Sequence, residues 1–281
     1  MQCFPDRVHR HPRRIDLEFH HRDSWTIEHT FAFPDHILAD PELILSMGSR
    51  ALAATTTGGA AMKVLVVGAS GGSGRATVRE LGHRGHEVTA FSRNATTVAG
   101  QVDGGLLRGV NGDATDPGDV DKAVRGQDAV IVTLGISENP VGVRLRGPAH
   151  TPLDVRSRGT GVVVEAMRRH GVRRLVVQTS YGVGPTRTHL PMLQRLVFWV
   201  LLRPQIVDTE RQERIVRSSG LDWTAVQPVN LTDDDPAEPP FVSTTGATRS
   251  MKVARTQVAW LLAESVENDG HIGATLSLSA R

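Results

Sequence analysis

The stretch that decides the fold is residues 62–74, which read Met-Lys-Val-Leu-Val-Val-Gly-Ala-Ser-Gly-Gly-Ser-Gly. Its apolar, β-branched run Val64–Val67 is typical of a buried parallel strand. Gly68, Gly71 and Gly74 follow in the spacing G-x-x-G-x-x-G. In a dinucleotide-binding turn, the first glycine permits the tight turn and the second lets backbone amides approach a pyrophosphate. The third lets the helix pack closely on the strand. The motif predicts such a turn, with an ordinary glycine-rich turn as the alternative.

A helix is predicted to begin at Gly72, because Ala76, Val78 and Leu81 lie on one face of a helical pattern. The N-terminus of a helix carries partial positive charge and free backbone N–H groups. This helix would therefore help to hold the pyrophosphate.

The end of the next predicted strand, 87–91, indicates which dinucleotide is bound. An NAD site usually carries Asp or Glu about 20 residues beyond the glycines, where the carboxylate holds the ribose 2′-hydroxyl. This chain instead has Arg93, and no acidic residue follows until Asp103. A guanidinium suits a 2′-phosphate because it stays charged and donates two hydrogen bonds at once. We expect NADP(H) rather than NAD(H), with a surface arginine at a strand end as the alternative interpretation.

Composition limits the class of protein. The 281 residues include 39% hydrophobic residues, enough for a sizeable core, and carry a net charge of +2. No dense block of Lys and Arg suggests a nucleic-acid partner. No apolar run reaches the roughly 20 residues that span a bilayer. Cys3 is the only cysteine, which excludes an intrachain disulfide and fits a reducing, cytoplasmic location.

The first 61 residues differ from the rest of the chain. They hold six of the twelve histidines, show no sustained strand or helix period, and end in the flexible stretch 55–61. We expect a disordered N-terminal extension, or upstream sequence translated ahead of a start at Met62, followed by one domain over 62–281. A histidine-rich metal-binding arm is the alternative, but no metal site is predicted.

From Met62 onward, predicted strands and helices alternate, which indicates an α/β fold of the Rossmann type: a doubly wound parallel sheet with helices on both faces. The strands are expected at 64–67, 87–91, 106–110, 129–134, 174–178, 223–227 and 275–279. The helices are expected to begin at 72 and about 117, and to cover about 153–170, 190–202, 205–219 and 255–267. Ligands of such sheets bind beyond the carboxyl ends of the strands. The loops that should face one crevice begin at Gly68, Ser92, Asp113, Gly135, Ser180 and Asn230.

From about Met62 to Leu278, the chain resembles the atypical short-chain dehydrogenase/reductases with an NAD(P)H-binding domain of the NmrA-like and biliverdin-reductase-B-like (flavin reductase) kind. Besides the glycine turn and Arg93, the resemblance rests on Gly112-Asp113-Ala114, Gly126–Val132 with Leu134-Gly135, His170-Gly171-Val172 leading to Thr179-Ser180, and Ser219–Thr224 before Pro228.

The resemblance implies a role for each matching position. The turn would hold the pyrophosphate, Arg93 the 2′-phosphate, and Asp113 with Ala114 the edge of the adenine. Leu134 and Gly135 would lie along the cofactor, and Ser180 near the nicotinamide. The implied cofactor-binding residues are Gly68, Ala69, Ser70, Gly71, Gly72, Ser73, Gly74, Arg93, Asp113, Ala114, Leu134 and Gly135.

The chain also departs from these relatives. Asn230 stands where biliverdin-reductase-B-like proteins have a histidine, and Ile136-Ser137 where they carry an arginine. Both departures argue against a biliverdin-type substrate. The late helix opens with Val253–Gln257 in place of an Ile-Ser-x-x-Asp pattern.

The usual catalytic pair of short-chain dehydrogenases is absent. Those enzymes use a Tyr as proton donor and a Lys four residues later that lowers its pKa. Tyr181 is the only tyrosine here, Pro185 stands four residues after it, and the three lysines are Lys63, Lys122 and Lys252. An ordinary carbonyl-reducing mechanism is therefore excluded.

Two functions fit these features. The first is an NADP(H)-dependent oxidoreductase that reduces a flavin, a quinone or a similar small acceptor, since such hydride transfer needs mainly the alignment of two rings. Ser180 would then bond the acceptor, unless it only caps the strand, and Tyr181 would donate a proton or stack. The second is a non-catalytic NADP(H)-binding redox sensor of the NmrA-like kind. The apolar pattern over 190–201 suits core packing, a wall of the acceptor pocket or a dimer face, so we expect a monomer or homodimer.

Overall fold

The computed structural model describes residues 60–99, 106–135, 151–189 and 192–281. The expected N-terminal extension over residues 1–61 lies outside the described residues, apart from its last two positions. Ile136 and Ser137, which mark one departure from the relatives, also lie outside them. The following description concerns the compact unit that runs from Gly58 to the C-terminus.

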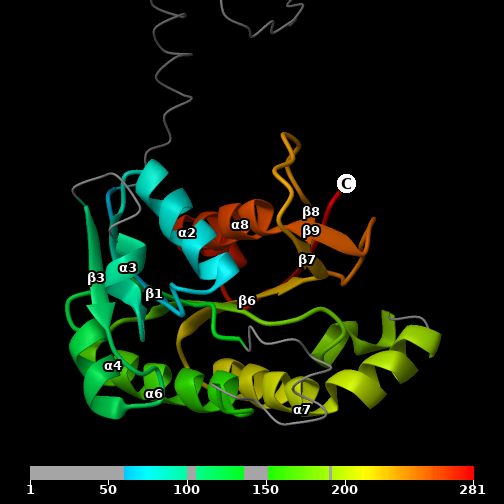
Figure 1. The fold of residues 1–281 in the computed structure, drawn as a ribbon, viewed down its shortest axis with the longest axis horizontal. Helices are drawn as coiled ribbons and strands as arrows, with labels where there is room; N and C mark the ends of the chain where they lie inside the picture. The colour runs from blue at the N-terminus through cyan, green and yellow to red at the C-terminus, as the bar shows by residue number, and fades with distance from the viewer. Residues whose placement is uncertain (1–59, 100–105, 136–150, 190–191) are drawn as a thin grey trace, which may run out of the picture. The chain divides into compact units, whose positions relative to one another are not determined.

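One eight-stranded sheet forms the centre of this unit, in the order β3-β2-β1-β4-β5-β6-β10-β8 (Figure 1). Its parallel strands are β1 (Lys63–Val67), β2 (Glu87–Ser92), β3 (Leu107–Asn111), β4 (Ala129–Val132), β5 (Arg174–Gln178), β6 (Asp222–Pro228) and β10 (Thr275–Ser279). The order of the first six is that of the Rossmann fold, with the switch point between β1 and β4. The predicted fold class is confirmed.

Three short strands complete the sheets, and the sequence did not predict them. β8 (Phe241–Ser243) pairs antiparallel with β10 at the edge of the large sheet. β7 (Asn230–Thr232) and β9 (Lys252–Ala254) form a separate two-stranded parallel sheet. Each has only three residues, too few to establish an alternating pattern in the sequence.

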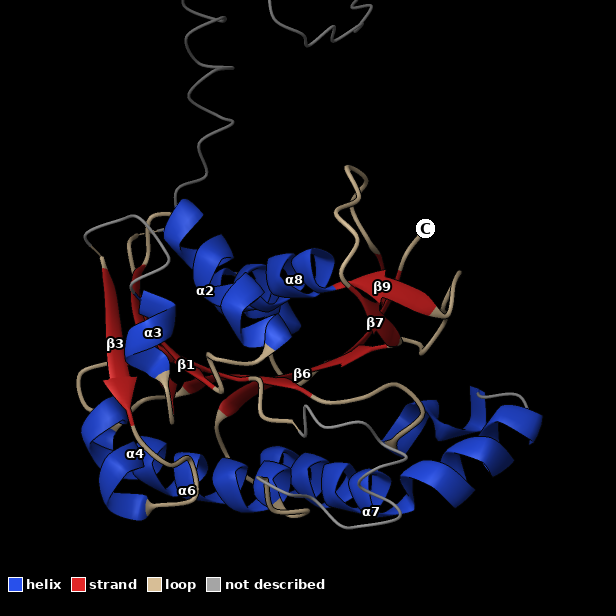
Figure 2. Cartoon of the chain, viewed as in Figure 1, coloured by secondary structure: helices blue, strands red, loops and turns tan. Residues whose placement is uncertain are grey.

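Helices cover both faces of the sheet (Figure 2). On one face lie α2 (Gly72–His83), α3 (Ala95–Ala99) and α8 (Arg255–Glu267); on the other lie α4 (Pro117–Val124), α6 (Val155–His170) and α7 (Met192–Arg217). Two short 3₁₀ helices, η1 (Gly184–His189) and η2 (Asp269–His271), complete the set for the described residues.

The two helices predicted over 190–202 and 205–219 are a single helix in the structure, and the prediction of two was wrong. α7 runs without interruption through Pro204. A proline inside a helix loses one backbone hydrogen bond and disfavours the helix by about 3 kcal/mol. The rest of this 26-residue helix supplies many hydrogen bonds and the packing against α6, which offset that loss.

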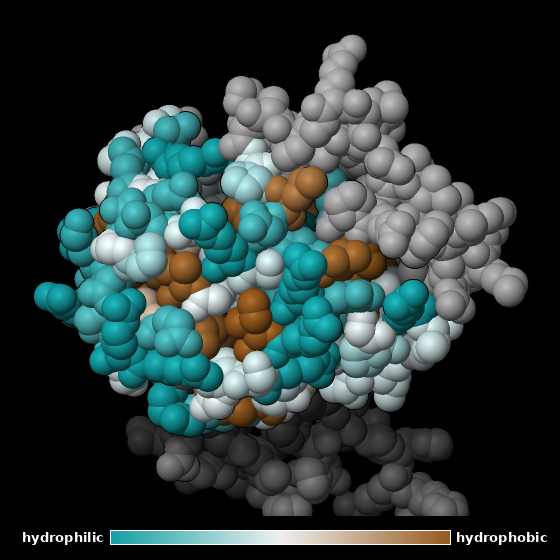
Figure 3. Space-filling model, turned by 90° about the horizontal axis from the view of Figure 1, so that it is seen from below, coloured by the Kyte–Doolittle hydropathy of each residue, from teal (hydrophilic) through white to brown (hydrophobic). Residues whose placement is uncertain are grey.

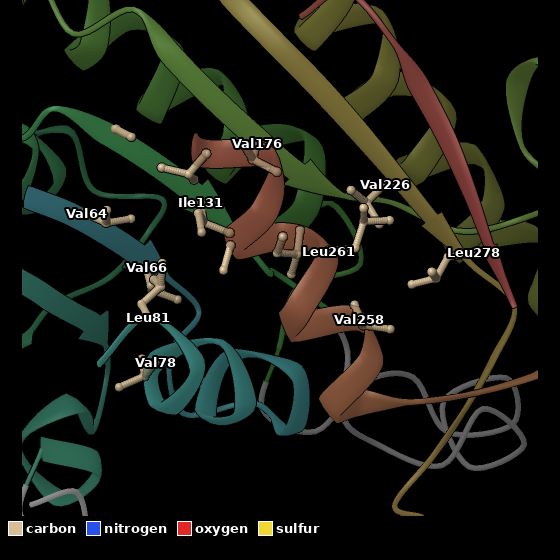
Figure 4. Close-up of a cluster of buried hydrophobic side chains, with 14 of the residues drawn as sticks. Val64, Val66, Val78, Leu81, Ile131, Val176, Val226, Val258, Leu261 and Leu278 are labelled. Carbon is tan, nitrogen blue, oxygen red and sulfur yellow. The ribbon is translucent and has the colours of Figure 1, made fainter. Parts of the chain in front are cut away.

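Strand β1 shows why the sheet needs helices on both sides. Its side chains alternate, so Val64 and Val66 join the core under α2 and α8, whereas Leu65 and Val67 join the core under α4 and α6. All four are fully buried. Figure 4 shows the first core, in which Val78 and Leu81 of α2 and Val258 and Leu261 of α8 meet the strand side chains. A continuous apolar run is therefore the expected signature of β1.

The face that α6 and α7 help to form is mainly hydrophilic where it is described, with hydrophobic patches between the hydrophilic residues (Figure 3). Val207 of α7 is one of the exposed large hydrophobic residues, at 37% exposure. Within the described residues, no helix combines the length and apolar character needed to cross a bilayer.

Candidate cofactor and active site

The turn after β1 is built around Gly68. Its backbone has φ +89°, and a β-carbon there would lie 3.0 Å from the carbonyl carbon and oxygen of Thr133. The amides of Gly68 and Ala69 both donate to the carbonyl of Phe91, at 2.9 and 3.2 Å. Only glycine combines this left-handed conformation with so close an approach to β4. The tight turn predicted at Gly68 is present.

Gly74 and Gly71 have different surroundings. A β-carbon on Gly74 would overlap the carbonyl oxygen of Gly68 and lie 2.9 Å from the Cα of Ala69, so α2 packs directly on the turn. Among the residues that the structure describes, a β-carbon on Gly71 would meet only the carbonyl oxygen of Gly68, at 3.4 Å. The packing of α2 therefore requires a glycine at 74, whereas the described residues leave space beside Gly71.

The start of α2 has the character of an anion site. Gly71 is its N-cap and makes no side-chain cap, and the first turn contains no acidic residue. The amide of Arg75 donates to the carbonyl of Gly71 at 2.9 Å, so the amides of Gly72, Ser73 and Gly74 precede it in the first turn. The Arg75 side chain braces the turn through a 2.6 Å hydrogen bond from Nη1 to the carbonyl of Ser70.

Arg93 and Asp113 come together at the ends of β2 and β3. The pKa of the Asp113 carboxyl lies below its usual value, chiefly because the amide of Thr115 donates to it at 2.8 Å. The Thr115 hydroxyl and the positive charges of Arg93 and Arg158 lower this pKa further, while partial burial opposes them. The Nη2 of Arg93 also donates to the Thr151 hydroxyl at 3.3 Å. The positive charges of two guanidinium groups thus act on one exposed carboxylate just after β3.

Ala114 and Leu134, both 9% exposed, line the approach to α6. Gly159 of α6 faces them, because a β-carbon on it would lie 2.6 Å from Cδ1 of Leu134 and 3.4 Å from the Ala114 carbonyl oxygen. A glycine at 159 therefore lets α6 approach the ends of β3 and β4 closely.

Gly135, directly after Leu134, is exposed and lies beside Arg156. The sequence did not indicate that Arg156 belongs to this region. The Nη2 of Arg156 is 3.1 Å from the position of a β-carbon on Gly135. Burial lowers the pKa of the Arg156 guanidinium, and the negative charge of Asp208 opposes that shift. The Asp208 carboxylate accepts the amides of Arg156 and Ser157 at 3.0 and 3.2 Å, which fixes the start of α6 against α7.

Ser180 and Tyr181 follow β5, as predicted, but their environments differ. Ser180 is half-buried. Tyr181 is only 6% exposed, belongs to the core under α2 and α8, and donates its hydroxyl to the carbonyl of Gly246 at 2.9 Å. The hydroxyl therefore ties the loop after β8 to the end of β5.

A buried polar network holds the segment after Ser180, and its members were not foreseen. Glu213 of α7, which is almost fully buried, accepts the Thr179 hydroxyl at 2.9 Å and the amide nitrogen of Gln227 at 2.6 Å. Gln227 in turn accepts the Thr186 hydroxyl at 2.8 Å. Because buried networks of satisfied groups are rigid, this one fixes the backbone that carries Ser180.

The departure at the start of α8 also has a structural explanation. Gln257 stands where the relatives have an aspartate, and its Oε1 accepts the amide of Ala254 at 3.2 Å, which caps the helix. Its Nε2 donates to the carbonyl of Glu238 at 2.9 Å. The amide side chain can do both because it carries an acceptor and a donor, whereas a carboxylate only accepts.

The model of the NAD(P)H-binding family matches residues 68–269. The chain belongs to the NAD(P)H-binding family. This match begins at the first glycine of the turn and ends beyond α8, so it includes the whole parallel sheet except β1 and β10. No group of three or more potential metal ligands gathers among the residues that the structure describes.

Several known proteins are similar to this member of the family. An uncharacterized chloroplastic protein of Arabidopsis thaliana is 29% identical over 175 residues, which cover 62% of this chain and 61% of that protein. A short-chain dehydrogenase/reductase of Veillonella parvula, solved in complex with NADP, has a TM-score of 0.63 at 17% identity and covers 78% of this chain and 94% of its own. ChuY, an anaerobillin reductase of Escherichia coli O157:H7, has a TM-score of 0.59 at 22% identity, with 77% and 96% covered. The likeness to these two structures shows the fold, and the chain spans about three-fifths of the Arabidopsis relative.

Proposed function

We propose that this chain is an NADP(H)-dependent oxidoreductase of the atypical short-chain dehydrogenase/reductase type that reduces a flavin, a quinone or a similar small acceptor. The observation that carries the proposal is the strand–turn–helix unit around Gly68, whose helix begins without an acidic residue. Backbone amides and an uncompensated helix N-terminus favour a diphosphate at this place. The membership of the chain in the NAD(P)H-binding family supports the assignment of a dinucleotide to this turn.

The choice of NADP(H) over NAD(H) is supported by charge at the ends of β2 and β3. Arg93 and Arg158 both lower the pKa of Asp113, so two positive charges act near the ends of β2 and β3, to which we assign the adenosine ribose. A 2′-phosphate would find a bidentate partner there, whereas the 2′-hydroxyl of NAD(H) would meet no carboxylate at position 93. We assign the diphosphate to Gly68–Ser73, the 2′-phosphate to Arg93, and the adenine edge to Asp113 and Ala114. Leu134 and Gly135 would lie along the cofactor.

The chemistry would consist mainly of holding two rings together. NADPH supplies the hydride, and the chain contributes the alignment of cofactor and acceptor. Ser180 would donate a hydrogen bond to the acceptor from a segment that the Glu213 network holds rigid. The acceptor would take its proton from water, because the Tyr181 hydroxyl is engaged with the Gly246 carbonyl.

A second candidate is a non-catalytic NADP(H)-binding redox sensor of the NmrA-like kind. The same bond of Tyr181 favours it, since a buried hydroxyl that holds a loop offers no general acid to a substrate. Both candidates share the cofactor site and differ only in turnover.

An NADPH-oxidation screen over FMN, riboflavin, quinones and dyes separates the two candidates. Steady oxidation with any acceptor supports the reductase. Tight NADPH binding without turnover across the screen supports the sensor and would contradict the reductase. We further propose that residues 62–281 are the functional domain, that the protein acts in the cytoplasm, and that it is a monomer or homodimer.

A further inference from the structure

Arg255, the first residue of α8, packs over Gly72 in the first turn of α2. A β-carbon on Gly72 would lie 2.6 Å from Nε of Arg255, 2.8 Å from its Cδ and 3.4 Å from its Cζ. Gly72 is not among the glycines with positive φ, so its backbone does not require glycine. The missing side chain instead leaves the space that the arginine occupies. Figure 1 shows α2 and α8 side by side on the same face of the sheet.

The guanidinium of Arg255 is held by an exposed aspartate. Its Nη1 lies 2.5 Å from Oδ1 of Asp233, which follows β7. The side chain of Arg255 is 28% exposed, whereas that of Asp233 is 89% exposed. Ion pairs with so exposed a partner contribute little, usually under about 1 kcal/mol. A doubly charged ligand can therefore replace Asp233 at small cost.

We propose that Arg255 is a diphosphate-binding residue, and that it exchanges Asp233 for the cofactor's diphosphate when the cofactor binds. The amides of Gly72 and Ser73, in the first turn of α2, are the donors to which we assign that diphosphate. The guanidinium lies against the same Gly72. Arginine can donate two hydrogen bonds to a phosphate, and here it would add a full charge to the partial charge of the helix terminus. This inference rests on the proposed cofactor site and is independent of the acceptor.

Cofactor fragments test the assignment, because ADP has the diphosphate without the 2′-phosphate and 2′-AMP has the reverse. In the full chain, Arg255→Gln should weaken ADP binding by about tenfold or more, as expected for a charged hydrogen bond. It should leave 2′-AMP binding within about twofold, since that fragment lacks the group that Arg255 binds. Arg93→Gln should show the opposite pattern. The dissociation constants are measured by calorimetry.

Two further variants control for charge and folding. Lys252→Gln removes a positive charge three residues from Arg255, on the exposed first residue of β9, and should leave ADP binding unchanged. Arg255→Lys keeps the charge but loses the planar fork, so its ADP affinity should lie between those of the unchanged protein and Arg255→Gln. Circular dichroism melting confirms that each variant is folded.

The exchange itself predicts a gain of affinity. Asp233→Asn removes the competing partner and should strengthen ADP binding by about two- to fivefold, the range set by an exposed ion pair. The same substitution should have no effect in the Arg255→Gln protein. If Asp233→Asn raises ADP affinity equally in both backgrounds, the gain is a general charge effect and the exchange is overturned. An Arg255→Gln protein that binds ADP normally would also overturn the proposal. If the unchanged protein binds neither ADP, 2′-AMP nor NADPH, the cofactor site itself is wrong and this inference with it.

Discussion

Arg93 is the residue on which the preference for NADP(H) depends. Replacing it with alanine should weaken NADPH binding by about 1.5–3 kcal/mol, the range of hydrogen bonds to charged groups. NADH binding should stay nearly constant, because NADH has no phosphate at that position. Fluorescence titration of both cofactors measures the difference. Arg79→Ala, which removes an exposed arginine of α2, is the matched control. Equal losses for NADPH and NADH would contradict the assignment.

Substitutions of Tyr181 and Ser180 distinguish a hydroxyl with a structural role from one that contacts the acceptor. We assign the structural role to Tyr181 and the contact to Ser180. Tyr181→Phe removes the bond to the Gly246 carbonyl. It should lower the free energy of unfolding by about 1 kcal/mol and turnover with a flavin or quinone by less than about tenfold. An essential general acid would contribute about 10²–10⁴-fold. Ser180→Ala should cost more turnover than Tyr181→Phe. Steady-state kinetics and thermal melts give both quantities, and a thousandfold loss in Tyr181→Phe would identify this tyrosine as the proton donor.

Individual residues differ in how far the sequence alone could assign them. Gly68 and Gly74 were predictable, because their spacing follows that of a glycine turn between a strand and a helix. The positions of Arg156 and Arg255 in the site were not predictable, because each packs against a glycine that is distant in sequence. Arg156 lies against Gly135, and Arg255 lies against Gly72. A single sequence contains no signal that joins residues 72 and 255. The glycine at 72 was a visible clue, because the G-x-x-G-x-x-G spacing of 68, 71 and 74 does not include it.

The turn between β1 and α2 allows a matched test at the level of the element. Gly71→Ala places a methyl group 3.4 Å from the Gly68 carbonyl oxygen, with φ −71° and ψ 163°, which alanine adopts freely. The free energy of unfolding should change by less than about 0.5 kcal/mol. NADPH binding should weaken by about tenfold or more, because the methyl group would occupy the space assigned to the diphosphate.

Gly74→Ala is the counterpart in the same turn. Its methyl group would overlap the backbone of Gly68 and Ala69, so the free energy of unfolding should fall by about 1–3 kcal/mol, as for overpacking of a core. Chemical denaturation and NADPH titration of both variants give the comparison. If Gly71→Ala binds NADPH as tightly as the unchanged protein, the ligand does not approach this glycine.

The elements show which signals a sequence carries strongly. Strands such as β1 and β4 lie between two layers of helices, and their uninterrupted apolar runs made them predictable. The strands β7, β8 and β9 have three residues each, and they form through pairing: β8 with β10, and β7 with β9. The two helices expected over 190–202 and 205–219 are one helix, α7, because its hydrogen bonds and packing outweigh the cost of Pro204. Local patterns thus predicted the seven parallel strands, whereas tertiary pairing determined β8 at one edge and the separate sheet of β7 and β9.

In the whole unit, the site depends on the sheet joining two halves of the chain. The first half supplies the turn after β1 together with Arg93 and Asp113, whereas Ser180, Asp233 and Arg255 come from the second. Because β1 pairs with both β2 and β4, it places the two halves next to each other at the switch point. Residues far apart in sequence can therefore meet one extended ligand, as doubly wound sheets commonly allow.

The boundary of the functional domain is the remaining prediction at this scale. Met62 belongs to the folded unit, since its carbonyl accepts the amide of Glu87 at 2.9 Å and its amide donates to Nδ1 of His86 at 3.2 Å. The preceding sequence lacks strand or helix periodicity and ends in a Thr/Gly/Ala stretch. Limited proteolysis of the full chain should therefore yield a stable fragment that starts near Met62. Mass spectrometry and N-terminal sequencing identify its first residue.

That fragment should keep the melting temperature and the NADPH affinity of the full chain, because both cores and every assigned cofactor residue lie within 62–281. A fragment that starts at Gly68 is the control. It lacks β1, whose loss would separate β2 from β4 and expose the buried valines of both cores, so it should not fold. A marked loss of melting temperature or affinity in the longer fragment would mean that residues before Met62 stabilise the domain, and the boundary would then lie nearer the N-terminus.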